Sequence, residues 1–268
     1  MRSLIRILLK AEVVLNYLVR GELRSIQVKN TSIHEVGGTS IDWQKFLPEN
    51  AVIVEVGAYN GHDSAYFAAT FPKGKVFCFE PDLELFAQVF EKSKIWSNIS
   101  CFPFAVAKKT EVCTFFPSYG DSRASGSIRL PTNHLEFFPD IIFPENKRNR
   151  TLSVSLDEFF SDEIGTVDLL WVDAQGSELE IFQGASKFLM SVSYIICEVS
   201  LIPLYDGGAS MSEIVSFLYS IGFTLLASDV DQSSNEYGQM GNAFFGRVNK
   251  SDSRQTTSVA LEVKNKEM

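Results

Sequence analysis

The chain has 268 residues, 45% of them hydrophobic and 21% charged, which is the composition of an ordinary folded protein. This length suits one large α/β domain with peripheral additions. The formal net charge of −9 argues against general binding of nucleic acid, since such binding needs a basic surface. The four cysteines form no C-x-x-C pair and have no neighbouring histidine pattern, which favours a reducing, cytoplasmic compartment and argues against a zinc site.

The first 21 residues are apolar and basic. Arg6, Lys10 and Glu12 interrupt the apolar run well before it reaches a bilayer-spanning length. No small-residue cleavage pattern follows an uncharged core, as a signal peptide would require. We therefore expect an N-terminal helix docked on the domain or on a partner, with a connector completing residues 1–50. Contact of this helix with a membrane surface and a cleaved targeting segment are the two alternatives.

Strands and helices alternate from residue 51 onward, and the alternation continues to residue 248. The apolar run at 51–56 is expected for a central parallel strand that is covered on both faces. In chain order the next expected elements are a helix at 63–70, a strand at 75–81, a helix at 82–93 opened by Pro81, and a strand region at 98–107.

Residues 111–150 interrupt this pattern with four prolines, several serines and glycines, and no sustained period. We expect an insertion of ordered loops over the edge of the sheet. The last twenty residues, 249–268, are polar and charged, which predicts a disordered tail. Regular elements resume at 152–160, followed by a strand at 167–176, a helix at 177–189, a strand at 193–199, a helix at 211–223 closed by Gly222, and an antiparallel pair of strands at 224–230 and 242–248.

Alternation of this kind predicts a doubly wound, mostly parallel sheet that binds its ligands at the carboxyl ends of the strands. Polar residues recur just past each expected strand. They are Glu55–Gly61, Glu80, Ala105–Lys108, Asp173–Gly176 and Glu198–Ser200.

The stretch EVGAYNG (Glu55–Gly61) joins the first strand to its helix. Gly57 and Gly61 let the backbone turn sharply and approach a ligand closely, and the helix start offers free N–H groups to an anion. Glu55 would repel a diphosphate but could accept a hydrogen bond from an ammonium group, so the turn suits a zwitterionic amino-acid tail. Glu80 follows the second strand, where an acid can accept both hydroxyls of a ribose. Together these features predict S-adenosylmethionine, a nucleoside that carries an amino-acid tail.

Two alternatives stay open on the residues alone. A glycine turn between strand and helix is common in any α/β fold and need not bind a cofactor. NAD is the rival ligand, although the third glycine of its G-x-G-x-x-G motif is missing here.

Six segments set the chain beside a known family. They are EVGAYNGHDS, FEPD, LDEFF after the insertion, VDLLWVDAQGSELEIFQGA, ICEVS and GNAFFGR, in this order. Over roughly residues 50–248 the chain resembles the FkbM family of S-adenosylmethionine-dependent methyltransferases. The resemblance implies a class I methyltransferase (Rossmann-like) α/β fold with a seven-stranded sheet of order 3-2-1-4-5-7-6. It also implies, most often, O-methylation of a sugar or natural-product hydroxyl.

The same resemblance implies where the cofactor would bind. Its ribose would lie at Glu80, beside Pro81. Tyr59 stands where the general class I turn has its middle glycine. The methionine part would be held by the first turn, with Glu55, Gly57, Ala58, Tyr59 and Gly61.

Two strand-end acids are candidates for the chemistry. Asp173 ends the fourth strand of the expected sheet, where it could orient the acceptor, take its proton or contact the cofactor's ammonium group. Capping the following helix is the alternative role for Asp173. Glu198 ends the fifth strand and could bind substrate together with Asp173, or belong to a divalent-metal site. We expect no metal, because two separated acids lack a third ligand.

His134 lies in the insertion, where a neutral imidazole could act as a general base. A surface position or a hydrogen-bonding role is the alternative. Arg123 and Arg129, among the serines of 121–130, could bind a hydroxylated or anionic substrate, or be solvated loop charges.

The sequence therefore predicts a cytoplasmic S-adenosylmethionine-dependent methyltransferase that acts on a hydroxyl of a saccharide or small metabolite. A non-catalytic scaffold that keeps a nucleoside pocket and an NAD-dependent oxidoreductase are the alternatives.

Overall fold

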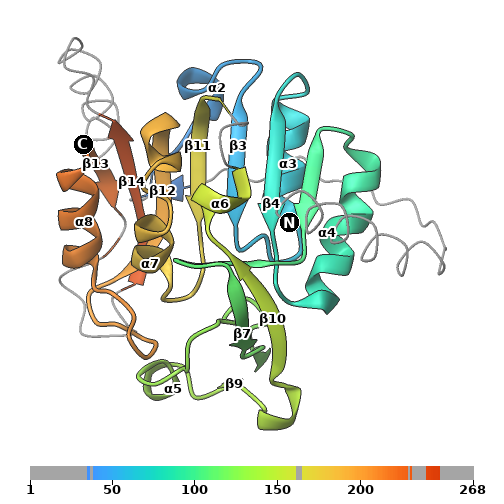
Figure 1. The fold of residues 1–268 in the computed structure, drawn as a ribbon, viewed down its shortest axis with the longest axis vertical. Helices are drawn as coiled ribbons and strands as arrows, with labels where there is room; N and C mark the ends of the chain where they lie inside the picture. The colour runs from blue at the N-terminus through green and yellow to red at the C-terminus, as the bar shows by residue number, and fades with distance from the viewer. Residues whose placement is uncertain (1–34, 37–38, 161–164, 229, 231–239, 248–268) are drawn as a thin grey trace. The chain divides into compact units, whose positions relative to one another are not determined.

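The computed structural model describes residues 35–36, 39–160, 165–228, 230 and 240–247 (Figure 1). The predicted N-terminal helix and the predicted tail lie outside the described residues. Within these ranges no helix combines the length and the apolar character needed to cross a membrane.

A seven-stranded sheet forms the centre of the fold, in the order β13-β14-β12-β11-β3-β4-β5 (Figure 1). The five strands from β12 to β5 pair in parallel, whereas β14 runs antiparallel to both of its neighbours. When the seven strands are numbered along the chain and read from β5 to β13, their order is 3-2-1-4-5-7-6. The predicted order is confirmed. The strands are β3 (Val52–Val56), β4 (Lys75–Phe79), β5 (Ile99–Phe102), β11 (Val167–Val172), β12 (Val192–Ser200), β13 (Phe223–Ser228) and β14 (Met240–Arg247).

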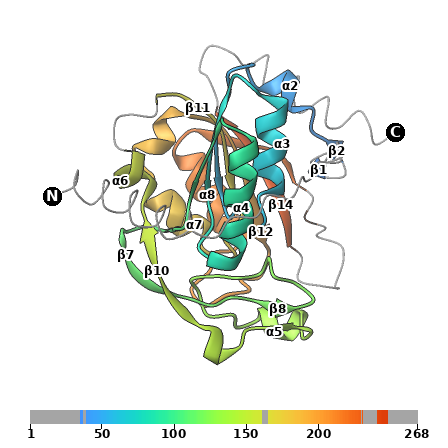
Figure 2. The same cartoon turned by 90° about the vertical axis from the view of Figure 1, so that its right-hand side faces the viewer.

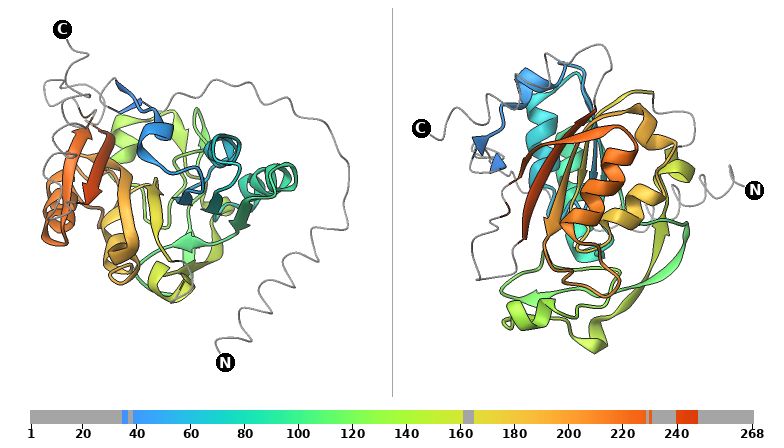
Figure 3. Two further views of the ribbon diagram at one scale, coloured as in Figure 1. Left: turned by 90° about the horizontal axis from the view of Figure 1, so that it is seen from above. Right: turned by 90° about the vertical axis from the view of Figure 1, so that its left-hand side faces the viewer.

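Helices cover both faces of the sheet, as Figures 2 and 3 show from opposite sides. One face carries α2 (Trp43–Phe46), α3 (His62–Thr70) and α4 (Leu83–Ile95). The other face carries α6 (Leu156–Phe160), α7 (Glu178–Gln183), the 3₁₀ helix η2 (Phe188–Ser191) and α8 (Met211–Ser220). Because both faces are covered, the central strands are apolar on both sides, as the run at 51–56 predicted.

An aromatic cluster forms much of the core on the α3 face. The Trp43 ring lies 5.8 Å from Phe67, 6.3 Å from Trp171 and 5.9 Å from Phe244, measured between centroids. Only 1% of Trp43 is exposed. Part of the segment predicted as a connector is therefore packed into the domain, preceded by the short pair β1 (Glu35–Val36) and β2 (Thr39–Ser40).

Two of the differences from the predicted helix boundaries have a clear physical cause. The Asp82 side chain accepts hydrogen bonds from the N–H groups of Glu84 and Leu85, at 2.9 and 3.3 Å. Asp82 therefore caps α4, and Pro81 precedes the cap instead of opening the helix. Helix α7 ends at Gln183 rather than at 189, because Gly184 caps it where the chain passes the Lys108 backbone: a Cβ on Gly184 would lie 2.5 Å from the Lys108 Cα.

The insertion is more regular than the sequence predicted, and it lies over the carboxyl ends of the central strands (Figures 1 and 2). Strands β6 (Ala105–Val106), β10 (Asn149–Val154) and β7 (Glu111–Phe115) form a second sheet in that order. Strand β10 is distant in sequence from β6 and β7, so a local hydrophobic period could not predict that they pair. The remaining elements are β8 (Tyr119–Gly120), α5 (His134–Phe137), β9 (Ile141–Ile142) and the 3₁₀ helix η1 (Glu145–Lys147).

Candidate active site

The turn after β3 is shaped by a close approach to the turn after β11. Gly57 has a φ of +86°, and a Cβ at this position would lie 1.7 Å from the carbonyl oxygen of Asp173. Only glycine fits there. Tyr59 also has a positive φ, of 51°, and its N–H donates to a Glu80 carboxyl oxygen at 2.8 Å. The fold thus brings four predicted site residues together at the ends of β3, β4 and β11.

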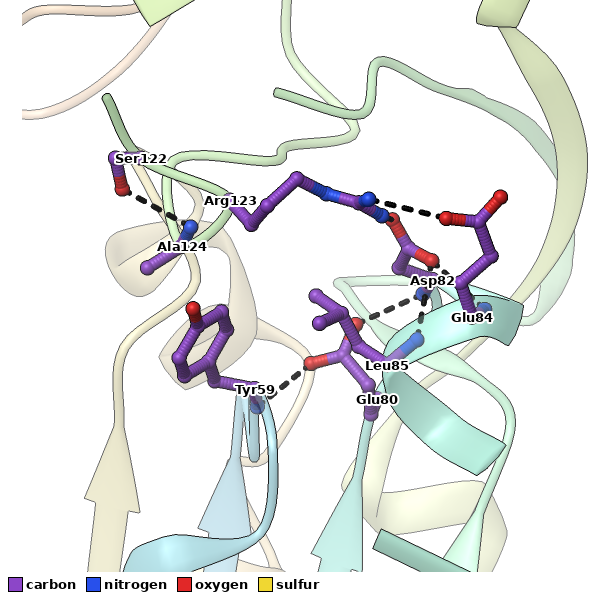
Figure 4. A network of polar contacts seen from close by, with 8 residues as sticks. All are labelled: Tyr59, Glu80, Asp82, Glu84, Leu85, Ser122, Arg123 and Ala124. Carbon is purple, nitrogen blue, oxygen red and sulfur yellow. Dashed lines mark hydrogen bonds and ion pairs between the residues drawn. The ribbon is translucent and has the colours of Figure 1, made fainter. Parts of the chain in front are cut away.

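Glu80 is buried and holds two turns at once (Figure 4). One oxygen accepts the Tyr59 N–H and the other accepts the Asp82 N–H, both at 2.8 Å. Burial raises the pKa of Glu80 to about 8, although these two hydrogen bonds act in the opposite direction. Each carboxyl oxygen keeps a further lone pair with which to accept a ligand hydroxyl.

A cavity that opens to solvent lies between these turns and the insertion; its empty space, counted with the open solvent at its mouth, is about 600 Å³. Its floor comes from the strand ends and its far wall from Phe104–Val106 and Phe115. The predicted site residues that line the cavity are Gly57, Tyr59, Glu80, Pro81 and Asp173. Those that lie outside its lining are Glu55, Ala58, Gly61, His134 and Glu198.

Glu55 points toward helix α3, where its carboxyl accepts a hydrogen bond from the Ser64 hydroxyl. Burial, and then the nearby Asp63 carboxyl, raise the pKa of Glu55 well above its ordinary value. Glu55 therefore joins the end of β3 to α3 and does not line the cavity. Its position does not favour the predicted contact with an ammonium group.

Two buried polar atoms in the cavity lining have no hydrogen-bond partner among the described residues. They are the hydroxyl of Ser177, which is 1% exposed, and Nε of Arg123. A buried polar group without a partner costs about 1–3 kcal/mol, so a ligand that supplied partners would regain this free energy on binding. The sequence analysis did not predict a role for Ser177.

Arg123 crosses from the insertion to the start of α4 (Figure 4). Its guanidinium contacts Asp82 at 2.9 Å and Glu84 at 3.0 Å, and lies 4.3 Å from the centre of the Tyr119 ring. Arg129 likewise pairs with Glu180 at 2.8 Å. The interpretation of both arginines as solvated loop charges is therefore wrong.

Asp173 and Glu198 meet through Gln175, which lies in the polar stretch predicted after the fourth strand but was assigned no role from the sequence. The amide nitrogen of Gln175 lies 2.8 Å from a carboxyl oxygen of each acid. Burial is the main cause that raises the pKa of both acids, and the hydrogen bonds from Gln175 oppose it. Asp173 does not cap α7, since Ser177 precedes that helix and Glu178 accepts the N–H groups of the turn.

A model of the methyltransferase FkbM domain matches residues 55–225 of this chain. The 2-O-methyltransferase NoeI of Sinorhizobium fredii (strain NBRC 101917 / NGR234) is 33% identical over 184 residues, which are 66% of this chain and 73% of that protein. The chain belongs to the FkbM methyltransferase family. S-adenosylmethionine is therefore its cofactor, and the fold is that of a class I methyltransferase.

Solved methyltransferase structures match at low identity. A putative rRNA-methylase from Clostridium thermocellum has a TM-score of 0.47 and 13% identity, with 76% of this chain and 90% of that one covered. An S-adenosylmethionine-dependent methyltransferase from Aquifex aeolicus has a TM-score of 0.40 and 16% identity, with 77% and 87% covered.

His134 does not line the cavity of this FkbM methyltransferase. Only 2% of it is exposed, and its ring packs within 5.3 Å of the rings of Phe138, Phe143 and Tyr205. Burial lowers the pKa of His134 to about 4, so the imidazole is neutral at neutral pH and a weak base. The alternative of a surface position is wrong, and the role as general base stays a prediction that this position does not favour.

The described residues contain no group of three or more histidine, cysteine, aspartate or glutamate side chains placed to hold a metal ion. The pair of acids at the ends of β11 and β12 is joined by an amide instead.

Proposed function

We propose that this FkbM methyltransferase transfers a methyl group from S-adenosylmethionine to a hydroxyl oxygen of a saccharide or another small metabolite. The observation that carries the proposal is the cavity at the carboxyl ends of β3, β4 and β11. Glu80, the acid expected to bind a ribose, and Asp173, the acid at the end of β11, both line this cavity. The 2-O-methyltransferase relative supports transfer to oxygen.

The residues of this cavity fit the cofactor. Glu80 offers two fixed oxygens to the ribose hydroxyls, because both oxygens are already oriented by backbone N–H groups. The Ser177 hydroxyl and Arg123 Nε supply unused polar atoms inside the same lining. The surrounding carboxyl groups suit a ligand that carries two positive charges, on its sulfonium and its ammonium group.

When bound, S-adenosylmethionine would supply an electrophilic methyl group to the acceptor oxygen, and the electron pair of the broken carbon–sulfur bond would stay on sulfur. Asp173 lines the cavity and would accept the proton that the hydroxyl loses. The insertion lies over the strand ends (Figure 1), where it would limit the access of water to the reacting groups once cofactor and acceptor are bound.

The test is transfer of an isotope-labelled methyl group to a panel of saccharides and small hydroxylated metabolites, detected by mass spectrometry. We expect the product to gain one CH₂ unit, with the methyl group on oxygen by nuclear magnetic resonance (NMR). Each acceptor is paired with an analogue that lacks the methylated hydroxyl, which should gain nothing.

Asp173→Asn should abolish most of the transfer. Wild-type protein that binds S-adenosylhomocysteine by calorimetry, yet methylates none of the acceptors, would instead support the non-catalytic scaffold. Transfer to nitrogen or carbon in preference to oxygen would overturn the proposed acceptor class.

A further inference from the structure

The side chain of Gln175 is buried between the ends of two parallel strands. Only 7% of the residue is exposed. Its amide nitrogen lies 2.8 Å from Asp173 Oδ1 and 2.8 Å from Glu198 Oε2. The two N–H groups of one amide therefore connect a carboxyl group in the cofactor cavity with a carboxyl group outside it.

Tyr205 and the two acids together orient this amide. The Tyr205 hydroxyl lies 2.8 Å from Gln175 Oε1 and 2.8 Å from the carbonyl oxygen of Ser125, and these two acceptors share its single proton. The carboxyl oxygens of Asp173 and Glu198 accept from the two amide N–H groups. A flipped amide would instead place Oε1 against two carboxyl oxygens.

The backbone of Gln175 is also held in an unusual conformation. Its φ is 52°, a value that residues other than glycine rarely adopt. The Ser127 hydroxyl, from the insertion, donates to the Gln175 carbonyl oxygen at 2.8 Å. Strain of this kind persists only where the surroundings hold the residue in place, and it is typical of functional sites.

Acidic groups face Asp173 from every neighbouring element. They are Glu55 on β3, Asp63 on α3, Glu80 after β4, Glu178 on α7, Glu198 on β12 and Tyr205 after β12. Burial and like charges both favour the protonated form of a carboxyl group, whereas a hydrogen bond donated to it favours the ionised form. An ionised Asp173 therefore depends on donors such as the Gln175 amide.

We propose that Gln175 is a positioning residue, whose amide orients Asp173 and Glu198 together and keeps Asp173 ionised so that it can receive the acceptor's proton. In this step the O–H bond of the acceptor breaks and its proton binds a carboxylate oxygen of Asp173. The proton-transfer part rests on the proposed function, whereas the effect of Gln175 on the two carboxyl groups does not.

The first test needs no acceptor. Wild-type, Gln175→Leu and Gln175→Glu proteins carrying ¹³C in their carboxyl groups are titrated by NMR, with the Asp173 signal assigned from Asp173→Asn. We expect the apparent pKa of Asp173 to rise by about one unit or more in both variants, because the donated hydrogen bond is lost. Gln183→Leu is the matched control, since Gln183 is an exposed glutamine whose amide oxygen accepts from Lys108. It should titrate as the wild type does.

An Asp173 signal that titrates at the wild-type pH in both folded variants would overturn the inference. If the leucine variant does not fold by circular dichroism, the nearly isosteric glutamate variant decides.

The second test uses an acceptor found in the methyl-transfer screen. At neutral pH we expect kcat of Gln175→Leu to fall by about tenfold or more and to recover partly as the pH is raised, with KM for S-adenosylmethionine nearly unchanged. An equal loss at every pH would indicate a merely structural role and contradict the inference. If the screen finds no acceptor for the wild-type protein, the proposed function is overturned instead. The carboxyl titration would then still decide the role of Gln175.

Discussion

Glu80 is the residue whose two oxygens each bind a backbone N–H from a different turn. Replacing it with glutamine keeps its size but leaves one acceptor oxygen for two donors, so one backbone N–H would face an NH₂ group. We expect Glu80→Gln to weaken binding of S-adenosylhomocysteine by about tenfold or more, measured by calorimetry, which corresponds to roughly 1.4 kcal/mol.

The control for this prediction is Glu91→Gln in α4, whose partly exposed carboxyl pairs with Lys94. It should bind like the wild type. Unchanged affinity of Glu80→Gln would contradict the placement of the ribose at this acid.

Ser177 makes a second prediction at this scale, because its buried hydroxyl has no partner in the described part of the chain. Ser177→Ala should leave the free energy of unfolding of the ligand-free protein unchanged or raise it, and should weaken cofactor affinity severalfold. Urea unfolding and calorimetry on the same sample measure the two effects.

Ser118 offers a matched control. Its hydroxyl is also buried and has no hydrogen-bond partner among the described residues, but it does not line the cavity. Ser118→Ala should show the same stability change with no loss of affinity. If both variants bind the cofactor equally well, the Ser177 hydroxyl makes no contact with it.

At the scale of elements, the insertion is fastened to α4 through Arg123, which pairs with the helix cap Asp82 and with Glu84 (Figure 4). Arg123→Gln removes this connection beside the cofactor cavity. We expect dissociation of S-adenosylhomocysteine to accelerate by about tenfold, measured by stopped flow, since two charge-assisted hydrogen bonds are lost.

Arg148→Gln is the control, because it shows whether the loss of any arginine of the insertion accelerates dissociation of S-adenosylhomocysteine. Arg148 pairs with Glu145, which is 85% exposed, so the change should have little effect. Equal dissociation rates in the wild type and Arg123→Gln would show that this contact does not retain the cofactor.

The alternation of apolar runs and turns was sufficient to predict the seven strands, and the resemblance to the FkbM family implied their order. The same local patterns could not predict β7 pairing with β10, in which Phe115 lies opposite Asn149, because such contacts join segments distant in the chain. The acids at the strand ends were predictable from topology. Gln175 was not selected, since its role depends on Tyr205 and Ser127, which reach it from other parts of the fold.

For the whole molecule, buried acids determine how stability depends on pH. Burial raises the pKa of Glu80 to about 8 and that of Glu178 to about 7, so the folded protein binds these protons more tightly than the unfolded chain does. Their contribution is fully present below the unfolded pKa and is lost as the pH rises through the folded values. We expect the Tm to fall between about pH 6 and about pH 9, measured by calorimetry in matched buffers.

Glu178→Gln keeps an oxygen for the Ala174 and Gly176 N–H groups, because both donate to one atom of Glu178. This variant should therefore lose part of the slope while remaining folded. A Tm that rises steadily over the same range would contradict the prediction. Below neutrality His134 acts in the opposite sense, since burial lowers its pKa to about 4 and the unfolded chain takes up its proton first.

The insertion over the cavity begins after β6 and ends in β10, and these two strands pair with each other. Everything between them is one contiguous stretch, while Glu80 and Asp173, the acids that line the cavity, follow strands of the central sheet. The insertion could therefore change in evolution, and with it the choice of methyl acceptor, while the strand ends below it stay the same. Grafting this stretch between relatives would be a direct route to new specificities.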